Sequence, residues 1–201
     1  MFMLLLILIY LSFIALGLPD SLFGTSWPII HQQFNLPLSY AGIVTITISL
    51  GTIISSLLSE KLNKKFGSGL VTTISVTMTA IALVGFSFST NLFMLILFSI
   101  PLGLGAGSVD AALNNYVAIN FKARHMSWLH CFWGIGASIS PYIMGYFLAN
   151  NERWDLGYLT VGIIQVVISI LLFNYLFLNF KVNLPIVSTL LDMKDMNKLW
   201  L

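Results

Sequence analysis

The chain has 201 residues, of which 58% are hydrophobic and only 8% are charged, and its mean hydropathy is +0.93. About a quarter of the residues of a soluble domain are charged, so this composition excludes an ordinary soluble domain and indicates an integral membrane protein. Nine Lys and Arg residues are too few for a nucleic-acid-binding surface. The single cysteine, Cys131, excludes an intrachain disulfide and a multi-cysteine metal site.

Six apolar stretches are long enough to cross a bilayer, which takes about 20 residues. The N-terminal run lacks the basic flank of a signal peptide, so we expect it to be a retained span. In chain order the predicted spans are 2–30, 40–59, 70–89, 92–119, 127–148 and 156–180. Their length favours helices over the shorter, alternating strands of a barrel. The expected fold is an all-α membrane protein with one six-helix bundle, 1–180, and a cytoplasmic tail, 181–201.

The basic residues predict the orientation, because Lys and Arg are retained on the cytoplasmic side of a membrane. With the N-terminus inside, Arg153 is the one basic residue that falls outside. The inside segments hold Lys61, Lys64, Lys65, Lys122, Arg124, Lys181, Lys194 and Lys198. We therefore expect a multi-pass protein of the plasma (cell) membrane with both termini in the cytoplasm.

The first predicted span contains a carboxyl group, Asp20, and two prolines, Pro19 and Pro28, that loosen the helix. A central Asp in a membrane costs roughly 2.5–3.5 kcal/mol on insertion scales, so such a group usually faces a cavity or a partner. Asp20 is therefore a candidate for proton coupling. Trp27 recurs on the same side of the helix and is a candidate for substrate binding, although it is equally consistent with an interfacial belt residue.

The fourth predicted span carries Gly103, Gly107, Asp110 and Asn114 at steps that place them on one helical face. For the glycines we favour a packing seam, in which small residues let a second helix approach. A seam does not need a carboxylic acid, so Asp110 is the second candidate for proton coupling. Asn114 and its neighbour Asn115 are candidates for substrate binding.

In the fifth predicted span, His130 shares a face with glycines and a proline. It is either an interfacial histidine that donates to a carbonyl, or a substrate-binding residue or proton carrier, since imidazole titrates near physiological pH. No second histidine lies at ligand spacing, so we expect no metal site. No catalytic triad or phosphate-binding loop is present, and we predict neither an enzyme nor a cofactor.

The first and fourth spans each open a triplet of helices, and each carries an aspartate followed four residues later by Gly24 or Asn114. Because three spans reverse the direction of the chain, the two triplets would be inverted repeats. Such repeats are common in secondary transporters, whose sites lie near the bilayer midplane at the repeat interface.

Three motifs carry a family resemblance: GLPDSLFGTSWP at 17–28, DAALN at 110–114, and WLHCFWGIG at 128–136 with SP at 140–141. Over residues 10–180 the chain resembles the N-terminal half of a major facilitator superfamily transporter, nearest to the fucose-permease-like sugar branch. Similar proteins use acidic residues in spans 1 and 4 for proton coupling and substrate binding. The resemblance thus implies secondary transport of a small, sugar-like solute, with Asp20, Asp110, Asn114 and His130 at the site.

The chain also departs from that family. Its run EKLNKKFG at 60–67 has a lysine where the family has an aspartate, and its stretch GASISPYIMG at 136–145 has a serine where the antiporter motif has a glycine. Symport and antiport therefore both stay open. Such transporters have twelve spans, so the expected partners besides the lipid bilayer, solute and protons are a second six-helix half or a second copy. The alternative is a truncated or non-transporting membrane scaffold.

Overall fold

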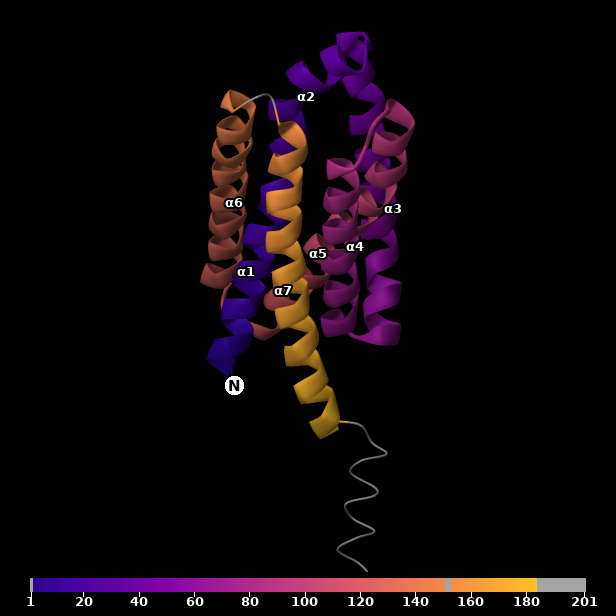
Figure 1. Cartoon of the computed structure of the whole chain (residues 1–201). Helices are drawn as coiled ribbons and strands as arrows, with labels where there is room; N and C mark the ends of the chain where they lie inside the picture. Colours follow the sequence, from indigo (N-terminus) through magenta and orange to yellow (C-terminus); the bar gives the residue numbers. More distant parts are fainter. Residues whose placement is uncertain (1, 151–152, 184–201) are drawn as a thin grey trace, which may run out of the picture.

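The computed structural model describes residues 2–150 and 153–183, with side chains placed for 3–150 and 153–175. Its helices stand side by side, and the N-terminus lies at the same end of the bundle as the end of α7 (Figure 1). The elements are α1 (Phe2–Asp20), α2 (Leu22–Gln33), the short 3-10 helix η1 (Leu38–Tyr40), α3 (Ala41–Phe66), α4 (Ser68–Ser87), α5 (Leu92–Asn120), α6 (Ala123–Ala149) and α7 (Trp154–Asn183). The predicted all-helical architecture is confirmed. The predicted tail beyond residue 183 lies outside the described residues.

Five helical segments of the described residues are long and apolar enough to cross a membrane. They are Met3–Gln33, Leu38–Phe66, Ser68–Ser87, Leu92–Asn120 and Trp154–Tyr175. Helix α6, which corresponds to the predicted fifth span, has 27 residues but is not among them. Its Ser, Gly, Pro, His and Tyr residues dilute the apolar ones and lower its hydropathy. The prediction of six spans is therefore not confirmed, although α6 has the length that a span needs.

The first predicted span is interrupted, as its prolines indicated, and the interruption falls between α1 and α2 at Ser21. Pro19 has no N–H, so it leaves the carbonyl of Ala15 without its usual helical donor. The side-chain amide of Gln165, on α7, donates to that carbonyl instead. Gln165 is buried, and its own oxygen accepts a hydrogen bond of 3.4 Å from Thr79 on α4. The broken end of α1 is thus fixed by two neighbouring helices.

Glycines set two close helix pairings, α1 with α6 and α3 with α5. A Cβ atom added to Gly17 or Gly136 would collide with the backbone of the facing helix in the first pair. A Cβ atom at Gly103 or Gly107 would collide with the backbone of α3 in the second. The glycines of α5 therefore form a packing seam, as small residues do between membrane helices.

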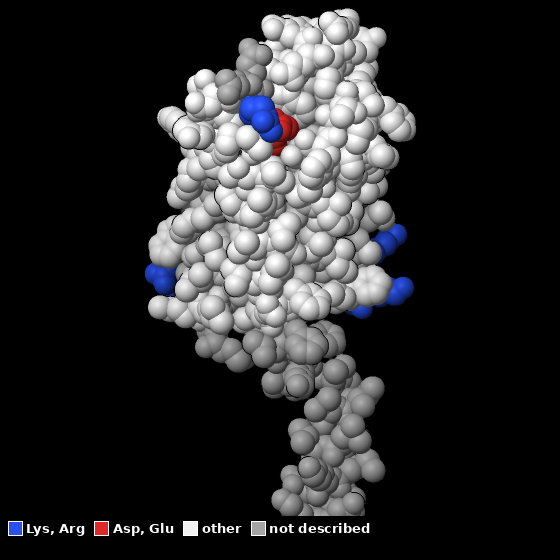
Figure 2. All heavy atoms as spheres, viewed as in Figure 1, with Lys and Arg blue, Asp and Glu red and all other residues white. Residues whose placement is uncertain are grey.

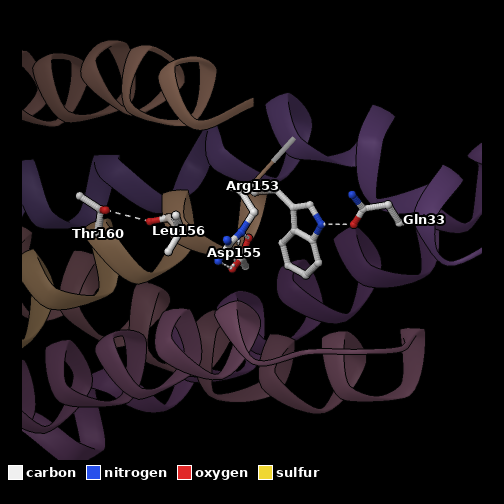
Figure 3. A network of polar contacts seen from close by, with 6 residues as sticks. Gln33, Arg153, Asp155, Leu156 and Thr160 are labelled. Atoms are coloured by element: carbon white, nitrogen blue, oxygen red, sulfur yellow. Dashed lines mark hydrogen bonds and ion pairs between the residues drawn. The ribbon is translucent and has the colours of Figure 1, made fainter. Parts of the chain in front are cut away.

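The two ends of the bundle differ in charge. Described basic residues lie in the last turns of α3 and at the start of α6, namely Lys61, Lys64, Lys65, Lys122 and Arg124. We call this the basic end; Figure 2 shows blue groups near it, an uncharged band above, and a blue group beside a red one near the opposite end. At the opposite end Arg153 pairs with Asp155 at 2.8 Å. Beside this pair, Trp154 donates to Gln33 at 2.7 Å, which joins α7 to α2 (Figure 3).

Candidate functional site

A central cavity of about 610 Å³ opens in the bundle and is lined by side chains from every long helix and from α2. Its volume lies within the range of small-molecule pockets, roughly 300–1,000 Å³. Phe13, Phe23, Phe86 and Leu102 provide apolar walls. The polar lining consists of Asp20, Thr45, Ser49, Thr52, Asp110, His130, Trp133 and Tyr158. The cavity therefore has the composition of a ligand site: mostly apolar walls with a few converging polar groups.

Asp20 is the last residue of α1 and lies at the break that Pro19 introduces. Its carboxylate accepts a hydrogen bond of 2.8 Å from the indole N–H of Trp133 on α6. The residue is exposed and lines the cavity. The helix break and the indole together fix the carboxylate at the cavity lining.

Asp110 lies in the middle of α5 and is half-buried. The side-chain amide of Asn114, one turn further along, donates to its Oδ1 atom at 2.9 Å. The amide oxygen of Asn114 is buried and has no hydrogen-bond partner among the described residues. Asp110 shares the lining of the cavity with Asp20 and His130. Two carboxyl groups and one imidazole therefore line the same cavity.

His130 lies on the cavity lining, with its ring edge-on to Phe13 at a centroid distance of 6.1 Å. One cavity is thus lined by Asp20 of α1, Asp110 of α5 and His130 of α6. Asn114 is not part of the lining but donates to Asp110. Their roles in proton coupling and substrate binding stay predictions.

The other two candidates lie away from the cavity lining. The side chain of Trp27 is only 4% exposed, and its indole N–H donates to the carbonyl of Leu38 at 2.9 Å, which ties α2 to η1. Asn115 is exposed on a different face of α5 from Asp110. Neither side chain reaches the cavity in this arrangement, and their predicted substrate contacts stay untested.

Sequence reasoning missed the polar residues of α3 and the indole donor of α6. Thr45, Ser49 and Thr52 all line the cavity. Their spacing of four and three residues places them on one helical face, so this signal was present in the sequence. The pairing of Trp133 with Asp20 had no such signal, because the two residues are 113 positions apart.

Comparison with known proteins identifies relatives among membrane transporters. Residues 9–188 match the family model of the Major Facilitator Superfamily. The glucose/mannose transporter GlcP of Bacillus subtilis (strain 168) is 25% identical over 74% of this chain and 37% of its own length. The probable sphingolipid transporter spinster homolog 1 of Arabidopsis thaliana is 26% identical over 72% and 30%. The niacin transporter NiaP of Acinetobacter baylyi is 23% identical over 61% and 29%.

The chain spans less than half the length of these relatives. Their names cover a sugar, a lipid and a vitamin, so the fucose-permease-like branch of the resemblance is not confirmed. The family itself is shown, because its model matches most of the chain and the structure is a helical bundle with five segments suited to cross a membrane. The chain therefore belongs to the Major Facilitator Superfamily of membrane transporters.

Proposed function

We propose that the chain is one six-helix half of a proton-coupled secondary transporter for a small, polar, sugar-like solute. The observation that carries the proposal is the cavity in which Asp20 and Asp110 share a lining with His130. A carboxylate only accepts hydrogen bonds, whereas a carboxyl group also donates one. Gain or loss of a proton at either aspartate therefore changes which solute hydroxyl groups the cavity can bind.

The proposal includes α6 as a membrane-spanning helix in addition to the five candidate spans. It also includes an inverted repeat of two three-helix units. Under that repeat the pair α1–α6 corresponds to the pair α5–α3. The glycine contacts support this correspondence, since each pair is closed by glycines facing the backbone of the other helix. The gathering of Lys and Arg at the basic end supports an orientation with that end, and both termini, in the cytoplasm of a cell-membrane protein.

Alternating access requires two bundles that rock about a shared site. We therefore propose that a second six-helix half, or a second copy of the chain, completes the cavity on its open side. The alternative function is a non-transporting membrane scaffold. Two observations distinguish the transporter from the scaffold: the coding sequence that follows this one, and the oligomeric state on blue-native electrophoresis. A second six-span segment downstream, or a paired species, supports transport, whereas a strict monomer that takes up no solute supports the scaffold.

The transport proposal is tested by Asp110→Asn in proteoliposomes, with radiolabelled glucose as the first solute because one relative is a glucose/mannose transporter. Loss of one hydrogen bond to a charged group, about 1.5–3 kcal/mol, corresponds to at least tenfold lower uptake. The variant is also expected to lose the pH dependence of uptake. The control is Thr47→Val. The hydroxyl of Thr47 donates to the carbonyl of Ile43 in its own helix, and Thr47 does not line the cavity. Unaltered uptake and an unaltered pH response in Asp110→Asn would contradict the assignment.

A further inference from the structure

The lining of the central cavity carries charge of one sign. Its acidic side chains are Asp20 and Asp110, and none of the described residues that line it is a lysine or an arginine. When both carboxyl groups are ionised, a neutral His130 leaves the lining with two negative charges, and a protonated one still leaves it negative. A solute that enters the cavity therefore meets a negative potential, which favours cations and disfavours anions.

Neither carboxylate has a lysine or arginine partner among the described residues. Asp20 accepts a hydrogen bond from the indole of Trp133. Asp110 accepts one from the amide of Asn114, so both protein donors are neutral. The ion pairs that the described residues form lie outside the cavity, and they are Lys64 with Glu60 and Arg153 with Asp155. Because a charge at membrane depth is costly without a partner, the cavity lacks a positive group that a solute can supply.

The hydroxyl groups of α3 leave the cavity richer in acceptors than in donors. Thr45 donates its proton to the carbonyl of Ala41 at 2.9 Å. Thr52 donates likewise to that of Ile48 at 3.0 Å, and each hydroxyl has only one proton. Ser49, which also lines the cavity, makes no hydrogen bond within the described part of the chain and can donate or accept. The lining thus suits a solute that is rich in N–H and O–H donors.

Aromatic rings form much of the remaining wall. The aromatic residues that line the cavity with the two carboxyl groups are Phe13, Phe23, Phe86, Trp133 and Tyr158. Aromatic rings attract cations, and tryptophan does so most strongly. Trp133 adjoins Asp20, since its N–H donates to that carboxylate at 2.8 Å. An indole and a carboxylate, two groups that attract an ammonium group, are therefore neighbours in the lining.

We propose that the solute of the central cavity carries an amino group in addition to its hydroxyl groups, as an amino sugar or an amino polyol does. The protonated amino group supplies the positive partner that Asp20 and Asp110 lack. The hydroxyl groups of the solute bind to the α3 wall at Thr45, Ser49 and Thr52. This inference rests on the proposed transport function, because it assigns the class of solute that the same cavity takes.

The test uses the full chain in nanodiscs of phosphatidylcholine and three probes with the same six-carbon skeleton. Glucamine is a cation, glucitol is neutral and gluconate is an anion. A ligand that binds only the folded state raises the melting temperature in a saturable way. We expect glucamine to act at concentrations about tenfold lower than glucitol, because hydrogen bonds between charged groups are the stronger kind, and gluconate to give no shift.

Equal shifts from glucamine and glucitol, or no shift from glucamine, would overturn the inference. The transport proposal has its own test, the uptake of glucose and its loss in Asp110→Asn. Failure of the inference and failure of the transport proposal are therefore distinguishable.

Four variants locate the recognition of the amino group. Asp20→Asn and Asp110→Asn keep the shape of the side chain and remove its charge, so each is expected to weaken glucamine binding about tenfold and glucitol binding much less. Ser49→Ala is expected to weaken the binding of both probes by the same factor, because it removes a partner of the solute hydroxyl groups. Glu60→Gln is the matched control, since it removes the charge of an exposed carboxylate outside the cavity.

The measured quantity is the preference for glucamine over glucitol in each variant. A substitution that only disturbs folding lowers the melting temperature without ligand but leaves this preference unchanged. An unchanged preference in both aspartate variants, or an equal loss of preference in Glu60→Gln, would show that the carboxylates of the cavity do not select the solute.

Discussion

At the scale of single residues, the hydrogen bond from Trp133 to Asp20 is the contact that fixes the first carboxylate of the central cavity. Trp133→Phe keeps an aromatic ring but removes the N–H donor. We expect solute uptake, measured as kcat/KM in proteoliposomes, to fall roughly tenfold, as for the loss of one hydrogen bond to a charged group. Trp128→Phe is the control, since Trp128 is an exposed tryptophan of the same helix that does not line the cavity. Equal effects of the two substitutions would remove Trp133 from the site.

The free-energy cost of a polar group in a membrane decides which site residues could be predicted from the sequence. Asp20 and Asp110 stand out because an ionisable group at that depth is expensive and needs a reason. Asn114 follows from Asp110 by helical spacing, and the structure places its amide 2.9 Å from that carboxylate. Trp133 could not be predicted as a partner, because an indole in a span carries no such cost and its contact with Asp20 depends on how α1 packs against α6.

At the scale of the helices, Gln165 compensates for the carbonyl that Pro19 leaves unpaired in α1. Gln165→Leu keeps a similar volume but leaves the carbonyl of Ala15 without its donor, whereas the hydroxyl of Thr79 still donates to the carbonyl of Val76 at 2.8 Å. An unsatisfied buried group costs about 1–3 kcal/mol, and in a protein of this size each kcal/mol lowers the melting temperature by about 2–4 °C. We therefore expect Gln165→Leu to melt several degrees below the wild type in thermal unfolding.

The double variant Pro19→Ala with Gln165→Leu tests the reason for this loss. Alanine at position 19 supplies the missing N–H, so the carbonyl of Ala15 regains a helical donor. The double variant is therefore expected to be more stable than Gln165→Leu alone, with a coupling energy between the two sites. Additive effects would show that Gln165 stabilises the bundle in some other way.

The sequence pattern predicts the existence of the helices well and their membrane placement less well. Long apolar runs predict where α3, α4, α5 and α7 form, and Pro19 predicts the break between α1 and α2. Periodicity does not decide whether α6 crosses the membrane, because its serines, glycines, Pro141 and tyrosines lower its hydropathy and it is not among the five candidate spans. Glycine spacing predicts a packing seam on α5, but only the packed structure assigns α3 as its partner.

At the scale of the whole molecule, the distinction between five and six spans determines on which side of the membrane each loop lies. If α6 crosses, the turn before it and the turn after it face opposite sides. If α6 does not cross, both turns face the same side. The basic end favours the first arrangement, since it includes Lys64 near the end of α3 and Lys122 just before α6, whereas Arg153 pairs with Asp155 just before and within the start of α7.

Single cysteines placed in these turns measure the difference directly. Starting from Cys131→Ser, which removes the exposed native thiol, Lys64→Cys, Lys122→Cys and Arg153→Cys are made one at a time and labelled with a membrane-impermeant maleimide. We expect the first two to react only in inside-out vesicles and Arg153→Cys only in right-side-out vesicles, because basic loops are retained in the cytoplasm. Labelling of Lys122→Cys and Arg153→Cys from the same side would instead exclude α6 as a span. With an even number of crossings the two termini of a chain lie on the same side of the membrane, and with five they lie on opposite sides. That result would therefore also exclude the inverted repeat and the cytoplasmic placement of both termini.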